Sequence, residues 1–140
     1  MIHIATAGPK GRGVFAGKSF VAGERIERLP VILIPQAQLQ FLEKTVLSYY
    51  TFRWGVDGKV GAIAGGCGCF YNHSYQPNSD YVKLVDQGFI DVVAIRPIRE
   101  KEEITVNYNG SPNDCTPIWF DGERWGWFHA DGRRDDSHGP

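Results

Sequence analysis

The sequence predicts a mostly β fold with one principal helix. Short segments rich in β-branched and aromatic residues recur between turns, as is typical of small antiparallel sheets. Residues 36–49 instead carry apolar side chains at the three- and four-residue spacing of an amphipathic helix. The chain has 140 residues, of which 42% are hydrophobic, enough for one core. We therefore expect a single domain.

The first half of the chain begins with strands around a glycine-rich loop at residues 8–13, where glycine allows positive φ and close backbone approach. Strands are expected at residues 2–6, 14–16, 24–29 and 31–34. The last of these is continuously apolar, which predicts a buried strand. Pro35 can open the helix, and the expected apolar face holds Leu39, Leu42, Val46 and Tyr49.

The second half of the chain predicts two hairpins and a final strand. Asp57-Gly58 is a hairpin signal between strands expected at 51–54 and 60–64. A second hairpin is expected from 81–85 and 89–95, and the final strand from 103–108. The sequence after Tyr108 is aromatic and rich in turn residues.

Charge and composition exclude some partners and compartments. The 15 basic and 16 acidic residues nearly cancel and form no long basic run, so we expect no direct binding of nucleic acid. No apolar stretch approaches the roughly 18 residues that span a bilayer, and the N-terminus does not resemble a signal peptide. Three cysteines do not form a disulfide framework, so we expect an intracellular, cytoplasmic location.

Several other chemical motifs are excluded by their spacing. Cys67 and Cys69 are too close for a structural zinc site and Cys115 has no second partner, so we expect buried thiols and no metal. A phosphate-binding loop at Gly17-Lys18-Ser19 would need glycine where Arg12 stands, followed by a helix. The adjacent His73 and Ser74 do not form a nucleophile–base pair.

Two segments carry the strongest functional signal. Asn72-His73-Ser74-Tyr75-Gln76-Pro77-Asn78 is a polar turn, and Glu102-Glu103-Ile104-Thr105-Val106-Asn107-Tyr108 is a strand that ends in a tyrosine. They follow Lys10-Gly11-Arg12-Gly13-Val14-Phe15-Ala16 in the chain. In this order they resemble the motifs of SET-domain lysine methyltransferases, and the chain is similar to the short viral and bacterial members.

The resemblance implies the β-clip fold of SET domains, with several small antiparallel sheets and a knot-like crossing of the C-terminal segment. It implies one SET domain over residues 1–128. The SET core would cover about residues 6–108, an aromatic flanking segment 109–128, and a polar tail 129–140.

The resemblance also implies in-line methyl transfer from S-adenosylmethionine to a lysine amine in a narrow aromatic channel. Tyr108 would be the catalytic residue. The residues implied to bind the cofactor are Lys10, Gly11, Arg12, Gly13, Asn72, His73, Tyr108, Trp119 and Phe120. The residues implied to line the substrate channel are Tyr50, Tyr71, Val106 and Tyr108.

The sequence departs from the family pattern near its catalytic tyrosine. Asn107 stands where an aspartate is usual, and Val106 where an aromatic residue often helps to set the number of methyl groups added. The number of methyl groups, and whether Tyr108 removes the lysine proton, therefore stay open. The cysteine-rich zinc segment of many members is absent, so the site would close by packing of the aromatic segment or with a partner subunit in a homodimer.

The implied partner is a protein with a target lysine, for which histones, ribosomal proteins and chromosomal proteins are alternatives. A viral member would act in the host nucleus. The alternative function is a SET-fold module that binds lysine-bearing peptides without catalysis. The presence of Asn72, His73 and Tyr108 favours the enzyme.

Overall fold

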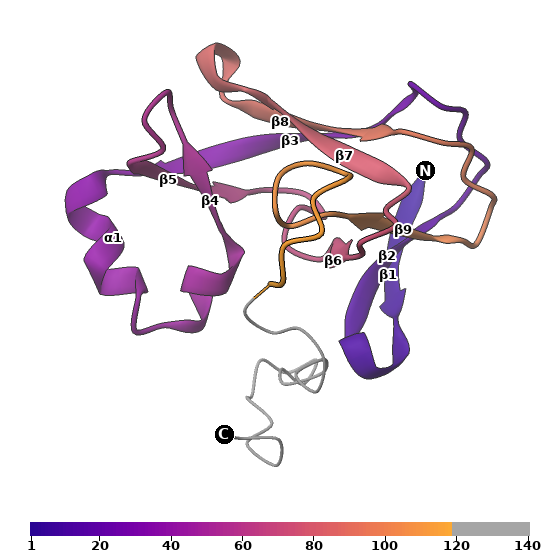
Figure 1. Cartoon of the computed structure of the whole chain (residues 1–140), viewed down its shortest axis with the longest axis horizontal. Coiled ribbons are helices and arrows are strands. Elements are labelled where there is room, and N and C mark those ends of the chain that lie inside the picture. Colours follow the sequence, from indigo (N-terminus) through magenta and orange to yellow (C-terminus); the bar gives the residue numbers. More distant parts are fainter. Residues whose placement is uncertain (119–140) are drawn as a thin grey trace.

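The computed structural model describes residues 1–118 as two small sheets that share one core (Figure 1). Residues 119–140, which hold the end of the predicted domain (119–128) and the predicted polar tail (129–140), lie outside the described residues. The strands are β1 (Ile2–Thr6), β2 (Arg12–Ala16), β3 (Arg25–Ile34), β4 (Thr51–Trp54), β5 (Val60–Ala64), β6 (Asn72–His73), β7 (Ser79–Leu84), β8 (Phe89–Ala94) and β9 (Glu103–Val106). The helical elements are α1 (Gln36–Leu42) and the 3-10 helices η1 (Gly8–Lys10), η2 (Val46–Tyr50) and η3 (Val85–Gln87).

The smaller sheet has the strand order β1-β2-β9-β6, and the larger one the order β4-β5-β3-β8-β7. Every pairing is antiparallel except that of β6 with β9. The mostly β fold with one α-helix is therefore confirmed for residues 1–118, and so are the two hairpins. The helices of this part of the chain are too short or too polar to cross a bilayer.

The core is built from alternate residues of strands in both sheets. Val14 and Ile104 come from the smaller sheet, and Leu29, Ile90 and Val92 from the larger one; all five are fully buried. Side chains alternate between the faces of a strand, so each sheet contributes one apolar face to the same interior. The two sheets consequently share one hydrophobic core.

The prediction of two short strands at 24–29 and 31–34 is wrong, because β3 runs unbroken from Arg25 to Ile34. The expected burial of its second half is also wrong. Ile32 is 70% exposed and Leu33 is 52% exposed. This half of β3 pairs with β5, and because consecutive side chains point to opposite faces, the described residues leave both of its faces partly uncovered.

The prediction of one helix over 36–49 is also wrong, since α1 ends at Leu42 and η2 follows. The Thr45 and Ser48 hydroxyls donate to the carbonyls of Leu42 and Thr45, at 2.8 and 2.9 Å. Such local side-chain bonds compete with the helical backbone pattern. The expected apolar face is split accordingly, and Val46 and Tyr49 are exposed.

The segment after β9 lies against the turn that follows β6. The Tyr75 hydroxyl donates to the Thr116 carbonyl at 3.3 Å and accepts from the Ile118 N–H at 3.2 Å. Ile118 is buried. The chain after β9 therefore passes beside the polar turn. The knot-like crossing stays a prediction.

A pair of matched substitutions on β3 tests this distribution of burial. Leu29→Ala removes a fully buried side chain and should lower the free energy of unfolding by about 2–5 kcal/mol. Leu33→Ala makes the same chemical change at a half-exposed position and should cost about 1 kcal/mol or less. Urea denaturation of both variants measures the difference. Equal losses would contradict the assignment of Leu29 to the shared core.

Candidate active site

The two polar segments singled out in the sequence lie side by side. β6 and β9 pair in parallel, with Asn72 opposite Thr105 and His73 opposite Val106. The Ser74 N–H extends the pairing by donating to the Val106 carbonyl at 2.9 Å. Residues about 30 positions apart in the chain therefore form one local structure (Figure 1).

Asn78 and Ser79 fasten the polar turn to β9. The Asn78 amide donates to the Glu103 carbonyl at 2.7 Å and accepts from the Thr105 N–H at 2.9 Å. The Ser79 hydroxyl donates to the Thr105 carbonyl at 2.8 Å. Both side chains are buried, so these bonds stabilise the turn and satisfy polar groups that would otherwise be costly to bury.

Tyr108, two residues after β9, is held by β6 and by the residue before that strand. Its N–H donates to His73 Nδ1 at 3.0 Å, and its hydroxyl donates to the Tyr71 carbonyl at 2.5 Å. Because His73 Nδ1 accepts a hydrogen bond, the neutral imidazole carries its proton on Nε2. The residues on either side of Asn72 thus fix the backbone and the hydroxyl of Tyr108.

A charged cluster joins the N-terminal loop to the same strands. Asn72 Nδ2 donates to the Arg12 carbonyl at 2.9 Å and to Glu103 Oε1 at 2.8 Å. Lys10 Nζ donates to Glu103 Oε2 at 3.3 Å. A Cβ on Gly13 would lie 2.7 Å from Glu103 Oε1 and 2.9 Å from Asn72 Nδ2, so any side chain here would displace the hydrogen-bonded Glu103 and Asn72.

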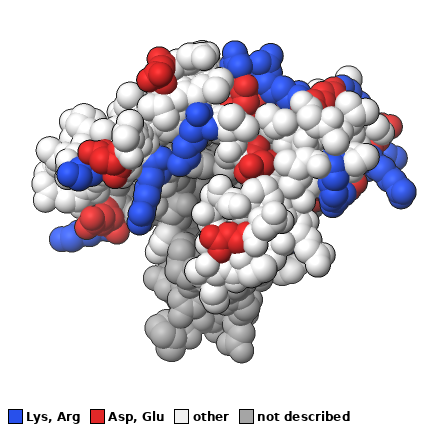
Figure 2. All heavy atoms as spheres, turned by 45° about the horizontal axis from the view of Figure 1, so that its top comes forward, with Lys and Arg blue, Asp and Glu red and all other residues white. Residues whose placement is uncertain are grey.

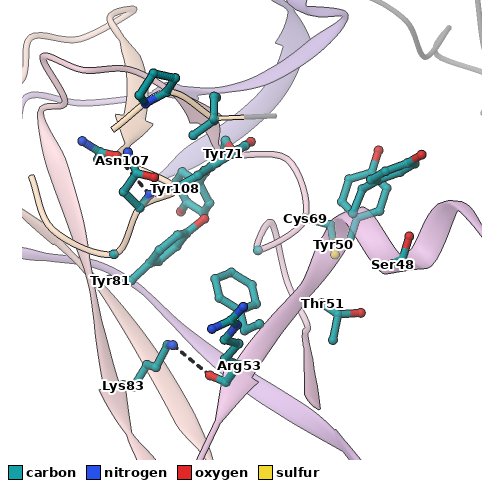
Figure 3. A pocket seen from close by; sticks show the side chains of 17 residues that line it. Ser48, Tyr50, Thr51, Arg53, Cys69, Tyr71, Tyr81, Lys83, Asn107 and Tyr108 are labelled. Carbon is teal, nitrogen blue, oxygen red and sulfur yellow. Dashed lines mark hydrogen bonds between the residues drawn. The ribbon is translucent and has the colours of Figure 1, made fainter. Parts of the chain in front are cut away.

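A cleft of about 800 Å³ opens beside Tyr108. Its aromatic lining includes Tyr50, Tyr71, Tyr81 and Tyr108, drawn from η2, β7 and the segments next to β6 and β9 (Figure 3). Three residues expected in the site, Tyr50, Tyr71 and Tyr108, therefore come together.

Other predicted site residues lie elsewhere. Val106 does not line this cleft and is fully buried in the core. The cleft lining also lacks the loop residues Lys10, Gly11, Arg12 and Gly13, and Asn72 and His73. His73 is joined to the cleft through its hydrogen bond with the Tyr108 N–H. Trp119 and Phe120 lie outside the described residues.

The environment keeps Tyr108 in its neutral form. The residue is 42% exposed, yet its hydroxyl points inward to the Tyr71 carbonyl. Burial raises the pKa of Tyr108 well above its ordinary value, and the neighbouring Tyr50 and Glu103 add to the rise. Burial likewise raises the pKa of Tyr81. The cleft therefore presents phenol groups, not phenolates, at neutral pH.

Glu27, which does not line the cleft itself, holds the lining residue Tyr71 in place. Its carboxylate accepts from the Tyr71 hydroxyl at 2.8 Å and from the Cys67 N–H at 3.1 Å. Gly66 has φ +57°, and a Cβ there would lie 2.3 Å from Glu27 Oε1. Since Tyr71 supplies the carbonyl that receives the Tyr108 hydroxyl, Glu27 helps to fix the position of that carbonyl.

Comparison with known proteins decides the family. The sequence model of the SET domain matches residues 11–109, most of the chain. The chain belongs to the SET-domain family. A solved structure from Plasmodium falciparum, named a putative histone methyltransferase, matches this SET domain with a TM-score of 0.60 and 27% sequence identity. The match covers 79% of the present chain and 99% of the other. A search of curated proteins gave no significant match.

Asn107, which stands where an aspartate is usual in the family, has a structural role in this SET domain. Its buried amide donates to the Asp114 carbonyl at 2.7 Å, and its Oδ1 accepts from the Asn109 N–H at 3.0 Å. A carboxylate accepts hydrogen bonds but cannot donate to a carbonyl. Asparagine therefore holds the loop after Tyr108 in a way that the usual aspartate would not.

The cysteines of the SET domain differ from the expected buried thiols. Cys67 and Cys69 are half-buried, and Cys115 is exposed. Burial raises the pKa of both Cys67 and Cys69, which disfavours the thiolate. Among residues 1–118 no three potential ligands gather as a metal site would require.

Sequence reasoning missed several residues that line or support the site: Glu27, Arg53, Tyr81, Lys83 and Glu103. Glu103 could have been found, since it belongs to the motif that ends in Tyr108. Arg53, Tyr81 and Lys83 enter because the larger sheet curls and brings β4 near β7. Glu27 on β3 reaches Tyr71 from 44 residues away. No local pattern signals either approach.

The raised pKa of Tyr108 predicts that this residue stays neutral in the folded protein at a pH where an ordinary tyrosine ionises. A raised pKa means that the folded state favours the neutral phenol. Tyr108 therefore stabilises the fold below about pH 10, and this contribution is lost as the pH rises through its folded pKa. We expect wild type and Tyr108→Phe to show equal tyrosinate absorbance at about pH 10. Urea-unfolded samples at the same pH should differ by about half a tyrosinate, because an unperturbed tyrosine is half ionised near pH 10. The same difference in the folded samples would contradict the prediction.

The bond between Glu27 and Tyr71 predicts energetic coupling. Tyr71→Phe removes a donor to a carboxylate and should lower the free energy of unfolding by about 1.5–3 kcal/mol. In a Glu27→Ala background the same change should cost at least about 1 kcal/mol less. Denaturant unfolding of the double-mutant cycle measures the coupling. Equal costs in the two backgrounds would show that the hydrogen bond contributes nothing.

Proposed function

We propose that this SET domain is a protein-lysine N-methyltransferase that uses S-adenosylmethionine, with Tyr108 as its catalytic residue. Family membership supports the reaction class. The observation that carries the assignment of Tyr108 is its hydroxyl, held on the Tyr71 carbonyl at the wall of an aromatic cleft. The protein substrate would be a histone, a ribosomal protein or a chromosomal protein.

The cluster around Glu103 fits the amino-acid end of the proposed cofactor. That end carries an ammonium and a carboxylate, and Glu103 and Lys10 offer charges of opposite sign at one place. Asn72 orients Glu103, and Gly13 leaves the space that a side chain would fill. When bound, S-adenosylmethionine would supply a methyl group on a positively charged sulfur.

The aromatic cleft fits a lysine side chain that must lose its charge. A lysine amine has an ordinary pKa of about 10.4, so neutralising it near pH 7 costs roughly 4–5 kcal/mol. The rings of Tyr50, Tyr71 and Tyr81 form walls of low polarity, which disfavour the ammonium and reduce this cost. Their rigid packing also orients the amine, and orientation of this kind can contribute about 7–11 kcal/mol to catalysis.

Tyr108 would act as a positioned hydroxyl. Burial keeps its phenol neutral, so it would hold its proton on the Tyr71 carbonyl and turn its oxygen to the reacting groups. A tyrosine with a raised pKa is a poor base at neutral pH. We therefore assign removal of the lysine proton to solvent rather than to Tyr108.

Tyr108→Phe tests the proposal. The ring is kept and the hydroxyl is lost, so kcat should fall about 100-fold or more, as is typical when one preorganised polar group is removed from a catalytic site. Transfer of radiolabelled methyl groups to proteins of a whole-cell extract, with mass spectrometry of the labelled lysines, measures activity and identifies the substrate.

Calorimetric titration with S-adenosylmethionine is the control, because cofactor affinity should change less than about threefold in this variant. If wild type binds the cofactor, labels no lysine and is indistinguishable from Tyr108→Phe, the enzyme assignment fails. That outcome would favour the peptide-binding module.

A further inference from the structure

The far end of the tyrosine cleft is formed where the two edges of the larger sheet meet. Lys83 Nζ on β7 donates to the Arg53 carbonyl on β4 at 2.8 Å (Figure 3). The rings of Phe52 and Tyr81 form an edge-to-face contact between the same strands, with centroids 5.0 Å apart. Arg53 and Lys83 therefore stand together on one continuous wall with Tyr81 and Tyr108.

The part of the cleft lining that the structure describes is positively charged. Of the 17 lining residues within positions 1–118, Arg53 and Lys83 are basic and none is acidic. Within residues 1–118, no carboxylate forms an ion pair with either of them. The ion pairs described lie elsewhere, at Lys10, Lys18, Arg25, Arg28 and Arg96.

The two cations also destabilise one another. Partial burial, with Arg53 as the neighbouring charge, lowers the pKa of Lys83. Lys83 already donates to a neutral carbonyl, which satisfies a hydrogen bond without neutralising its charge. An anion at this end of the cleft would relieve the repulsion.

The charge here contrasts with the rest of the surface. Basic and acidic groups are interspersed on the face drawn in Figure 2, where a diagonal run of Lys and Arg atoms crosses the middle. The chain as a whole has a formal net charge of −1. An uncompensated positive site in the cleft is therefore a local feature and not a consequence of overall charge.

We propose that Arg53 and Lys83 select substrates in which an aspartate or glutamate lies within a few residues of the target lysine. This inference rests on the proposed function, because it takes the cleft to be the place where the target lysine enters. Charges at the rim of an interface act mainly on association and on discrimination between partners. A basic residue at the same position in the substrate is repelled.

Peptides with one central lysine in a neutral background test the inference. Aspartate, asparagine or arginine is placed at each of the three positions on either side of the lysine. At the best position, wild type should show kcat/KM about 3- to 10-fold higher for aspartate than for asparagine, with arginine lowest. The gain should appear in KM, and it should shrink in about 0.5 M salt, which screens exposed charges.

Variants of Arg53 and Lys83 test whether these two residues cause the preference for aspartate. Arg53→Gln and Lys83→Gln should each reduce the preference for aspartate, and the double variant should abolish it. Lys83→Arg keeps the charge and a donor and should retain the preference. Arg99→Gln removes the same charge from an exposed position that does not line the cleft, and should leave the preference unchanged. Melting temperatures identify any variant that fails to fold.

Fluorescence anisotropy of the same peptides separates this inference from the proposed function, because binding needs no methyl transfer. If no peptide is methylated but aspartate peptides bind more tightly in an Arg53-dependent manner, the enzyme assignment fails and the charge preference stands. If peptides are methylated with aspartate and arginine equivalent within about twofold, or if the double variant keeps the preference, the inference is overturned.

Discussion

The parallel pairing of β6 with β9 is the constraint on which the rest of the site depends. Only two residues of β6 take part, a short pairing that is weak by itself. Asn78 and Ser79 reinforce it with buried hydrogen bonds to β9. This arrangement brings His73 to the Tyr108 backbone and Asn72 to Glu103, so the tyrosine and the charged cluster take their positions from one junction.

Much of the fold could be predicted because its strands carry local signals. The hairpin at Asp57-Gly58 follows from turn chemistry, and the described strands on either side begin and end where expected. The errors arose where tertiary context decides. An apolar run such as 31–34 does not reveal how far the rest of the fold covers its two faces. Apolar spacing over 36–49 does not reveal the side-chain bonds of Thr45 and Ser48.

The residues of the site likewise fall into those that the sequence could predict and those that it could not. Asn72 and Tyr108 belong to compact motifs, so the sequence could mark them, although their proposed roles stay predictions until tested. Arg53 and Lys83 are 30 residues apart and meet only because the sheet curls until its edge strands approach. Glu27 is likewise 44 residues from the tyrosine that it holds. Contacts that depend on sheet curvature leave no trace in spacing or composition.

The asparagine at position 107 has a consequence for the working range of the protein. Its buried amide fastens the loop after Tyr108 through uncharged groups. A carboxylate in that place would change its bonding on protonation, whereas an amide has no proton to gain in this range. The wall of the cleft on this side should therefore keep its shape in mildly acidic surroundings and at high ionic strength, so responses to acidity or salt would arise at the charged groups around it.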